Sequence, residues 1–146
     1  MFLPILITIV LAFVCAIIHA LGLLMLFYWQ ARQWPRIEAN FRPRHNLPYF
    51  LTLFSVILFL HLLEIGVWAG AYAGWNCLPD FESSFYFSGV TYASLGYGDV
   101  VLPRPWRLVG VVESITGMLL LGWSAAFFFT VVSRLFDLRI QKWSKK

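Results

Sequence analysis

Residues 94–100 of the chain read Ser-Leu-Gly-Tyr-Gly-Asp-Val, and this short stretch lies between two long apolar runs. Glycine disfavours both helices and strands, because it loses more conformational freedom on folding than any other residue. Two glycines around one tyrosine therefore predict a segment without regular secondary structure. What that segment does depends on the sequence around it.

The composition is that of an integral membrane protein. Of the 146 residues, 60% are hydrophobic and 12% are charged, and the mean hydropathy is +0.75. A soluble domain is about 45–50% apolar and about 25% charged, so this apolar excess excludes a small soluble protein. The formal net charge of +4 does not indicate nucleic acid binding, because the basic residues flank apolar runs instead of clustering with aromatic side chains.

Three apolar runs are each longer than the about 20 residues that cross a membrane as a helix. They cover residues 2–29, 48–74 and 106–133. The first run is not a signal peptide, since it has no basic start, is too long and is not followed by a cleavage motif. We therefore expect three transmembrane helices, the first of them within residues 1–31.

The charges between the runs predict the orientation. Basic residues outnumber acidic ones in a linker, 32–47, where Glu38 is the single acid, and in a tail, 137–146, where Asp137 is, whereas the segment between the second and third runs carries Asp80, Glu82 and Asp99. By the positive-inside rule, the linker and the tail are cytoplasmic, and the N-terminus and the glycine-rich stretch are external. Cys77 is then external as well, where it could bridge to another subunit or stay free.

The stretch before the glycines is apolar again. Residues 83–93 read SSFYFSGVTYA, and Ser83 or Ser84 could cap a short helix there. About 11 residues are too few to cross a bilayer, and irregular backbone at membrane depth persists only inside protein or along a water-filled path. A short helix going in and an irregular segment coming out therefore predict a re-entrant loop beside a hydrophilic pathway.

This order of segments resembles the tetrameric potassium channels, whose selectivity filter usually reads T-V-G-Y-G-D. The resemblance covers 48–136, as outer helix 48–74, pore helix 83–93, filter 94–99 and inner helix 106–135. It implies an all-α membrane protein with three transmembrane helices plus a re-entrant pore helix and filter loop in each subunit. Four subunits would form a C4 homotetramer that conducts potassium passively and selectively, and the extra N-terminal helix would pack outside the pore.

The resemblance also assigns roles to the filter residues. The carbonyl oxygens that replace the water around K⁺ would be those of Ser94, Leu95, Gly96 and Tyr97. Gly96 and Gly98 would let the backbone alternate in hand, which turns successive carbonyls toward one axis. The Ser94 hydroxyl would complete the innermost ion site, and the Tyr97 ring would pack against the pore helix. Asp99 would lie at the outer mouth, concentrate cations and bond to neighbours behind the filter.

Four positions depart from the family pattern. Ser94 and Leu95 stand where Thr and Val are usual, Ala93 stands where the preceding residue is usually Thr, and Val90 stands where some members carry an acid that braces the filter. A weakly selective or non-selective cation channel is therefore one alternative. A non-conducting membrane scaffold is a second alternative, from another functional class.

The inner helix contains Gly117, which aligns with the hinge glycine of the family. It could bend the helix or let helices pack closely. One face of this helix, which lines the cavity in the family, carries Met118, Leu121, Ala125 and Phe129. Apolar side chains of this kind can gate a pore by dewetting, and ordinary helix packing is the alternative.

Ionisable groups inside membrane spans are functional candidates. His61 and Glu64 lie on one face of the outer helix, and Glu113 lies on the inner helix. We expect Glu113 to contact His61 or Glu64 behind the filter, with structural pairing favoured over pH sensing. A metal site at His61 and Glu64 is not expected, because the sequence shows no third ligand. His19 is assigned no function.

The sequence shows no nucleophile–base pair, nucleotide loop or metal cluster, so we expect no enzymatic activity and no cofactor apart from K⁺ ions in the filter. The expected partners are further copies of the chain and membrane lipids, without nucleic acid or a small-molecule substrate. A compact chain with a short tail favours a bacterial plasma membrane, and the sequence does not indicate what opens the pore.

Overall fold

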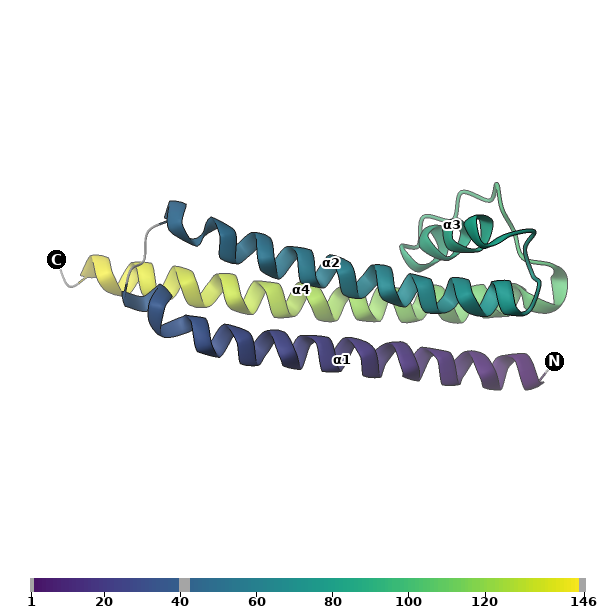
Figure 1. Ribbon diagram of the computed structural model, residues 1–146, viewed down its shortest axis with the longest axis horizontal. Helices are drawn as coiled ribbons and strands as arrows, with labels where there is room; N and C mark the ends of the chain where they lie inside the picture. Colours follow the sequence, from purple (N-terminus) through teal and green to yellow (C-terminus); the bar gives the residue numbers. More distant parts are fainter. Residues whose placement is uncertain (1, 40–42, 145–146) are drawn as a thin grey trace.

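The computed structural model describes residues 2–39 and 43–144, and every regular element within these ranges is helical. Three long helices, α1 (Phe2–Ala39), α2 (Pro43–Gly74) and α4 (Arg107–Ser144), run alongside one another (Figure 1). The short helix α3 (Phe81–Tyr92) packs against α2 and α4 at one end of the bundle, and a 3₁₀ turn, η1 (Arg104–Trp106), leads into α4. The long helices are each long and apolar enough to cross a membrane, and the chain is an integral membrane protein.

The long helices extend beyond their predicted ends. α1 continues to Ala39 and α2 begins at Pro43, so most of the predicted linker 32–47 is helical, and α4 continues through the predicted tail 137–146 as far as Ser144. The added turns are rich in Arg, Gln, Leu and Lys, which are favourable helix formers. Residues 40–42 of the linker and 145–146 of the tail lie outside the described residues.

The buried apolar residues form two clusters along the bundle. The cluster near α3 contains Cys15, Trp68, Tyr72, Cys77, Tyr92, Leu102, Val109 and Leu120. The cluster toward the other end contains Leu23, Leu26, Trp34, Ile37, Tyr49, Leu53, Val131 and Leu135. Many large apolar side chains point outward instead, as expected for helices whose surroundings are lipid or other subunits.

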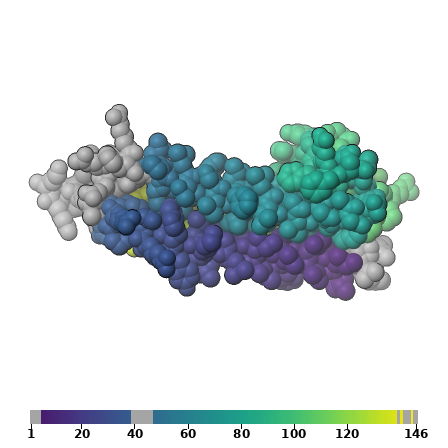
Figure 2. All heavy atoms as spheres, viewed as in Figure 1, coloured from purple at the N-terminus to yellow at the C-terminus, as the bar shows by residue number. Residues whose placement is uncertain are grey.

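α3 and the loop after it form a lobe at one end of the molecule (Figure 2). The N-terminus of α1 lies at this end, and the C-terminus lies at the opposite end (Figure 1). α3 packs closely against α4 at Gly110, where an added Cβ would be in van der Waals contact with the Phe87 ring of α3, at 3.5 Å. The lobe therefore sits on the frame that α2 and α4 provide.

The cap of α3 differs from the prediction. Asp80, with extended backbone (φ −152°), caps the helix, and its Oδ1 accepts a hydrogen bond of 2.7 Å from the Ser83 N–H. Ser84 lies one turn inside, where its hydroxyl donates to the Asp80 carbonyl at 2.9 Å. The hydrogen bond from the Ser83 backbone lowers the pKa of Asp80, so the cap is strongest when this carboxylate is ionised.

The sequence left open whether Cys77 bridges to another subunit or stays free. Its side chain is only 7% exposed and belongs to the aromatic cluster near α3, and this burial raises the pKa of the thiol. Both cysteines of the chain are free. Within the described chain Cys77 packs in the interior, which favours the free thiol.

Candidate functional site

Residues 94–99 leave the C-terminal end of α3 as irregular backbone. The torsion angle φ is positive at every second residue, with 58° at Ser94, 57° at Gly96 and 79° at Gly98. Glycine adopts such angles at little cost, whereas Ser94 is one of the uncommon non-glycine residues that do so. The peptide units of this loop therefore alternate in hand, which is the backbone pattern predicted for it.

Hydrogen bonds fix the inner start of the loop. The Ser94 N–H donates to the Thr91 carbonyl at 2.9 Å, and the Leu95 N–H donates to the Val90 carbonyl at 2.9 Å. The Ser94 hydroxyl lies 3.0 Å from the hydroxyl of Ser114 on α4. The first residues of the loop are thus held by the last turn of α3 and by α4.

The outer end of the loop is tied back to α3. The Tyr86 hydroxyl donates a 2.6 Å hydrogen bond to Asp99 Oδ2. This hydrogen bond lowers the pKa of Asp99 and raises the pKa of Tyr86. Asp99 was predicted to bond to a neighbour behind the filter, and Tyr86 is such a neighbour.

The middle of the loop makes few contacts within the chain. The Tyr97 side chain is 67% exposed and Leu95 is 56% exposed. The packing of Tyr97 against the pore helix therefore stays a prediction for the assembled protein. The ring is available for contacts with something outside the chain.

One buried carboxylate, Glu113 on α4, holds the middle of α3. Its Oε1 lies 2.5 Å from the Ser88 hydroxyl, and its Oε2 accepts a 2.6 Å hydrogen bond from Tyr72 on α2. The single hydroxyl hydrogen of Ser88 also faces the Ile65 carbonyl at 3.0 Å. Both Ser88 contacts are hydrogen bonds when Glu113 carries a proton and donates it to Ser88. We call Glu113, Ser88 and Tyr72 the Glu113 anchor.

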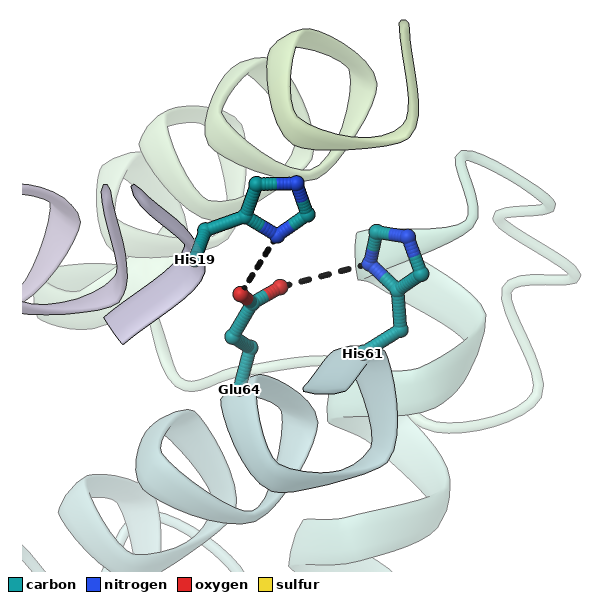
Figure 3. A group of neighbouring side chains, drawn as sticks. All are labelled: His19, His61 and Glu64. Atoms are coloured by element: carbon teal, nitrogen blue, oxygen red, sulfur yellow. Dashed lines mark hydrogen bonds and ion pairs between the residues drawn. The ribbon is translucent and has the colours of Figure 1, made fainter. Parts of the chain in front are cut away.

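The second buried carboxylate, Glu64 on α2, holds the end of α3. Its Oε1 lies 2.8 Å from Nδ1 of His19 on α1, and its Oε2 lies 3.3 Å from Nδ1 of His61. The hydroxyl of Tyr92, the last residue of α3, donates to Oε2. Figure 3 shows both imidazole rings turning a nitrogen toward the carboxylate. We call Glu64, His19, His61, Tyr92 and the nearby Ser124 the Glu64 anchor.

These two anchors correct the sequence interpretation of the intramembrane acids. Glu113 was expected to contact His61 or Glu64, but it bonds Ser88 and Tyr72 instead. His19, which was assigned no function, is the partner that joins α1 to Glu64. The only sequence signal for His19 is a polar residue inside an otherwise apolar run, which does not name a partner.

Gly117 is a close-packing position. A Cβ added there would lie 2.2 Å from the Tyr92 carbonyl oxygen and 2.9 Å from the Tyr92 ring, while α4 continues as a helix through it. Of the two interpretations, the structure favours packing over a hinge. The four residues predicted to line the cavity are exposed in the single chain: Met118, Leu121, Ala125 and Phe129.

The chain has three membrane-capable helices, with a short helix and an irregular, glycine-containing loop between the second and third. This arrangement is typical of pore-forming membrane proteins. A family model described as "Ion channel" matches residues 49–134. The match covers more than half of the chain, from Tyr49 in α2 to Arg134 in α4, and the chain belongs to this ion channel family. Comparisons with curated proteins and with solved structures find no match. α1 precedes the matched residues.

Proposed function

We propose that the protein is a potassium-selective channel, in which four identical chains surround one axial pore. The observation that carries this proposal is the alternation of positive φ at Ser94, Gly96 and Gly98 in a loop that reads S-L-G-Y-G-D. A K⁺ ion gives up its hydration shell only where rings of carbonyl oxygens replace it. The ions would bind at the carbonyls of Ser94, Leu95, Gly96 and Tyr97.

A single chain supplies one wall of such a filter, so the pore needs further copies. Exposed apolar side chains support this assembly, because they occur on both the loop and the inner helix. Tyr97 is 67% exposed, and Phe129 on α4 is 71% exposed. In the proposed C4 tetramer, neighbouring subunits cover Tyr97. The face of α4 that carries Leu121 and Phe129 turns toward the axis of the pore.

The C-terminal end of α3 and the far end of the loop after it both favour cations. The C-terminal end of a helix carries a partial negative charge, and α3 ends at Tyr92, just before the loop. Asp99, with its pKa lowered by Tyr86, supplies a carboxylate at the other end of the loop. With the basic linker 32–47 and the basic tail 137–146 in the cytoplasm, Asp99 and the N-terminus face the outside of a plasma membrane.

A weakly selective cation channel is the second candidate, and one contact favours it. The Ser94 hydroxyl, which the innermost ion site would use, is engaged by Ser114 at 3.0 Å. Ser94 also lacks the methyl group of the usual Thr, so less packing holds it in place. The two candidates differ in selectivity and share the same pore.

A flux experiment tests the proposal. The purified protein is reconstituted in liposomes, and flux is compared under potassium and sodium gradients, with barium as a blocker. We expect potassium flux that barium blocks and that Gly96→Ala abolishes, because a side chain at φ +57° is strained. Gly70→Ala on α2 is the control, since its Cβ would meet no atom within 4 Å.

The other outcomes separate the alternatives. Equal flux of both cations would establish the weakly selective pore. A monomeric protein without any cation flux would overturn the channel mechanism and leave the non-conducting scaffold. Potassium flux that survives Gly96→Ala would show that the ions do not pass through this loop.

A further inference from the structure

We propose that His19, His61 and Glu64 form a binding site for a divalent transition metal such as Zn²⁺, which joins α1 to the channel domain. The site is separate from the proposed ion filter, and its test does not require conduction. Figure 3 shows the three side chains converging from α1 and α2.

The donor set fits such an ion. One ligand atom from each residue can be chosen so that all three lie within 4.8 Å of one another. Donors on one Zn²⁺ at about 2.0–2.2 Å lie roughly 3.4 Å apart in a tetrahedron, and two imidazoles with one carboxylate are a usual zinc set. Small rotations of the two rings would bring the donors to that spacing. The Tyr92 hydroxyl, 2.8 Å from His61 Nδ1, offers a fourth ligand atom.

A count of hydrogens shows that the metal-free cluster is incomplete. Both imidazoles contact Glu64, and His61 also contacts Tyr92. In addition, each imidazole places Nε2 near the Ser124 hydroxyl, at 3.1 Å for His61 and 3.2 Å for His19. With His61 Nδ1 sharing one hydrogen between Tyr92 and Glu64, five hydrogen bonds need a hydrogen. Two neutral imidazoles, Tyr92 and Ser124 supply four. One contact therefore has no hydrogen while Glu64 is ionised and both imidazoles are neutral.

A metal ion removes this shortage. When both Nδ1 atoms and the Glu64 carboxylate bind the ion, each Nε2 keeps its hydrogen and donates it to Ser124, whose oxygen can accept two hydrogen bonds. The Tyr92 hydroxyl still donates to Glu64. Every group is then in its ordinary protonation state, and Ser124 orients both ligand rings, as second-layer partners of metal-bound histidines do.

A cavity beside the cluster gives a metal ion access to it, and the cluster lies next to the start of the loop. His61 and Ser124 also line a cavity of about 420 Å³ between α2 and α4, so the cluster is reached from one side of the chain. Tyr92 precedes the loop residue Ser94 by two positions. An ion at this point would hold α1 against α2 and steady the last turn of α3 before the loop.

The test is metal binding to the purified full-length protein after removal of metals with a chelator. We expect one Zn²⁺ or Co²⁺ per chain, a Co²⁺ absorption spectrum of a four-coordinate site, and a higher unfolding temperature with metal than without. Pulsed electron paramagnetic resonance of bound Cu²⁺ should detect two imidazole nitrogens. These measurements use the unmodified protein, so they decide the proposal even if a variant does not fold.

Variants then identify the ligands. Glu64→Gln keeps the shape, and its amide hydrogens complete the hydrogen bonds of the cluster, so the variant should fold but lose the metal. His19→Gln should also lose it, whereas Ser124→Ala should weaken binding by about 10–100-fold. The matched control, Glu113→Gln, should bind like the unmodified protein. The proposal is overturned if the stripped protein takes up no metal, or if Glu64→Gln and His19→Gln bind as tightly as this control.

Discussion

The two buried carboxylates hold the same short helix in different ways. In the Glu113 anchor, the carboxyl group meets two hydroxyl groups, those of Ser88 and Tyr72. In the Glu64 anchor, the carboxylate meets two imidazoles and Tyr92. Both acids are fully buried, so the difference lies in their neighbours.

The difference separates the channel domain from the extra helix. Every residue of the Glu113 anchor lies within 49–134, the range shared with the ion channel family. The Glu64 anchor also needs His19, which lies on α1 outside that range. The first anchor is therefore complete without α1, whereas the second depends on α1 for one of its two imidazoles.

The largest expected effect comes from removing Glu64. Glu64→Ala leaves two imidazoles and the Tyr92 hydroxyl without their buried acceptor, and breaking such a buried network costs about 3–5 kcal/mol of unfolding free energy. Glu113→Ala should cost less, about 1–3 kcal/mol, because the Ser88 hydroxyl keeps its hydrogen bond to the Ile65 carbonyl. Thermal and denaturant unfolding of the two variants in detergent micelles measures the difference. Equal losses would contradict the distinction between the anchors.

A glycine between the anchors gives the next effect. Gly117→Ala places a methyl group 2.2 Å from the Tyr92 carbonyl oxygen, and the backbone has to shift, which typically costs about 1–3 kcal/mol. Gly122→Ala on the same helix meets no atom within 4 Å, and there the better helix propensity of alanine adds about 1 kcal/mol of stability. The two substitutions should therefore change the unfolding temperature in opposite directions. A hinge at Gly117 would instead leave stability nearly unchanged and alter gating.

A third substitution disturbs only the anchor that uses α1. A Cβ at Gly22, one turn after His19, would lie 2.5 Å from both methyl carbons of Leu60 on α2. Because a side chain can change rotamer, we expect Gly22→Ala to cost only about 1 kcal/mol and to weaken metal binding through His19. In a Leu60→Ala background the same substitution should have almost no effect. A double-mutant cycle measures this coupling, and additive effects would show that α1 does not pack here.

The spans and the loop could be predicted because their signals are local. Apolar length shows the three helices, and the glycines at 96 and 98 show where the backbone takes positive φ. The Asp80 cap was also within reach, since Asp is a strong capping residue and stands directly before the apolar stretch. The prediction placed the cap on the serines because they precede the longer apolar run.

The anchors could not be predicted because they depend on contacts between distant residues. His19 and Glu64 are 45 positions apart, and no periodic pattern in either apolar run shows which faces meet. Gly117 fitted both a hinge and a packing contact until the Tyr92 carbonyl was found against it. Tyr97 is exposed in the single chain, and its packing against a pore helix stays a prediction for the assembled protein.

The smallest expected effect concerns the outer tie between Tyr86 and Asp99, which belongs to neither anchor. The hydrogen bond lowers the pKa of Asp99, so the stability it adds is present above the ordinary carboxyl range and is lost as the pH falls through the lowered pKa. Tyr86→Phe should return the Asp99 pKa toward its ordinary value, with Tyr28→Phe as the control. Carbon-13 NMR titration of the Asp99 carboxyl measures the change.

The same variant shows whether this tie matters for conduction. Both side chains are exposed in the single chain, so Tyr86→Phe should leave the unfolding temperature nearly unchanged, unlike substitutions in either anchor. Its effect should appear as a lower potassium flux at a pH near the ordinary carboxyl pKa, because an Asp99 whose pKa has risen to that range loses its negative charge at a higher pH. If the NMR pKa stays low in Tyr86→Phe, the charge is stabilised by the backbone N–H groups near Asp99 and Val100, and the pH dependence of flux should match that of the unmodified protein.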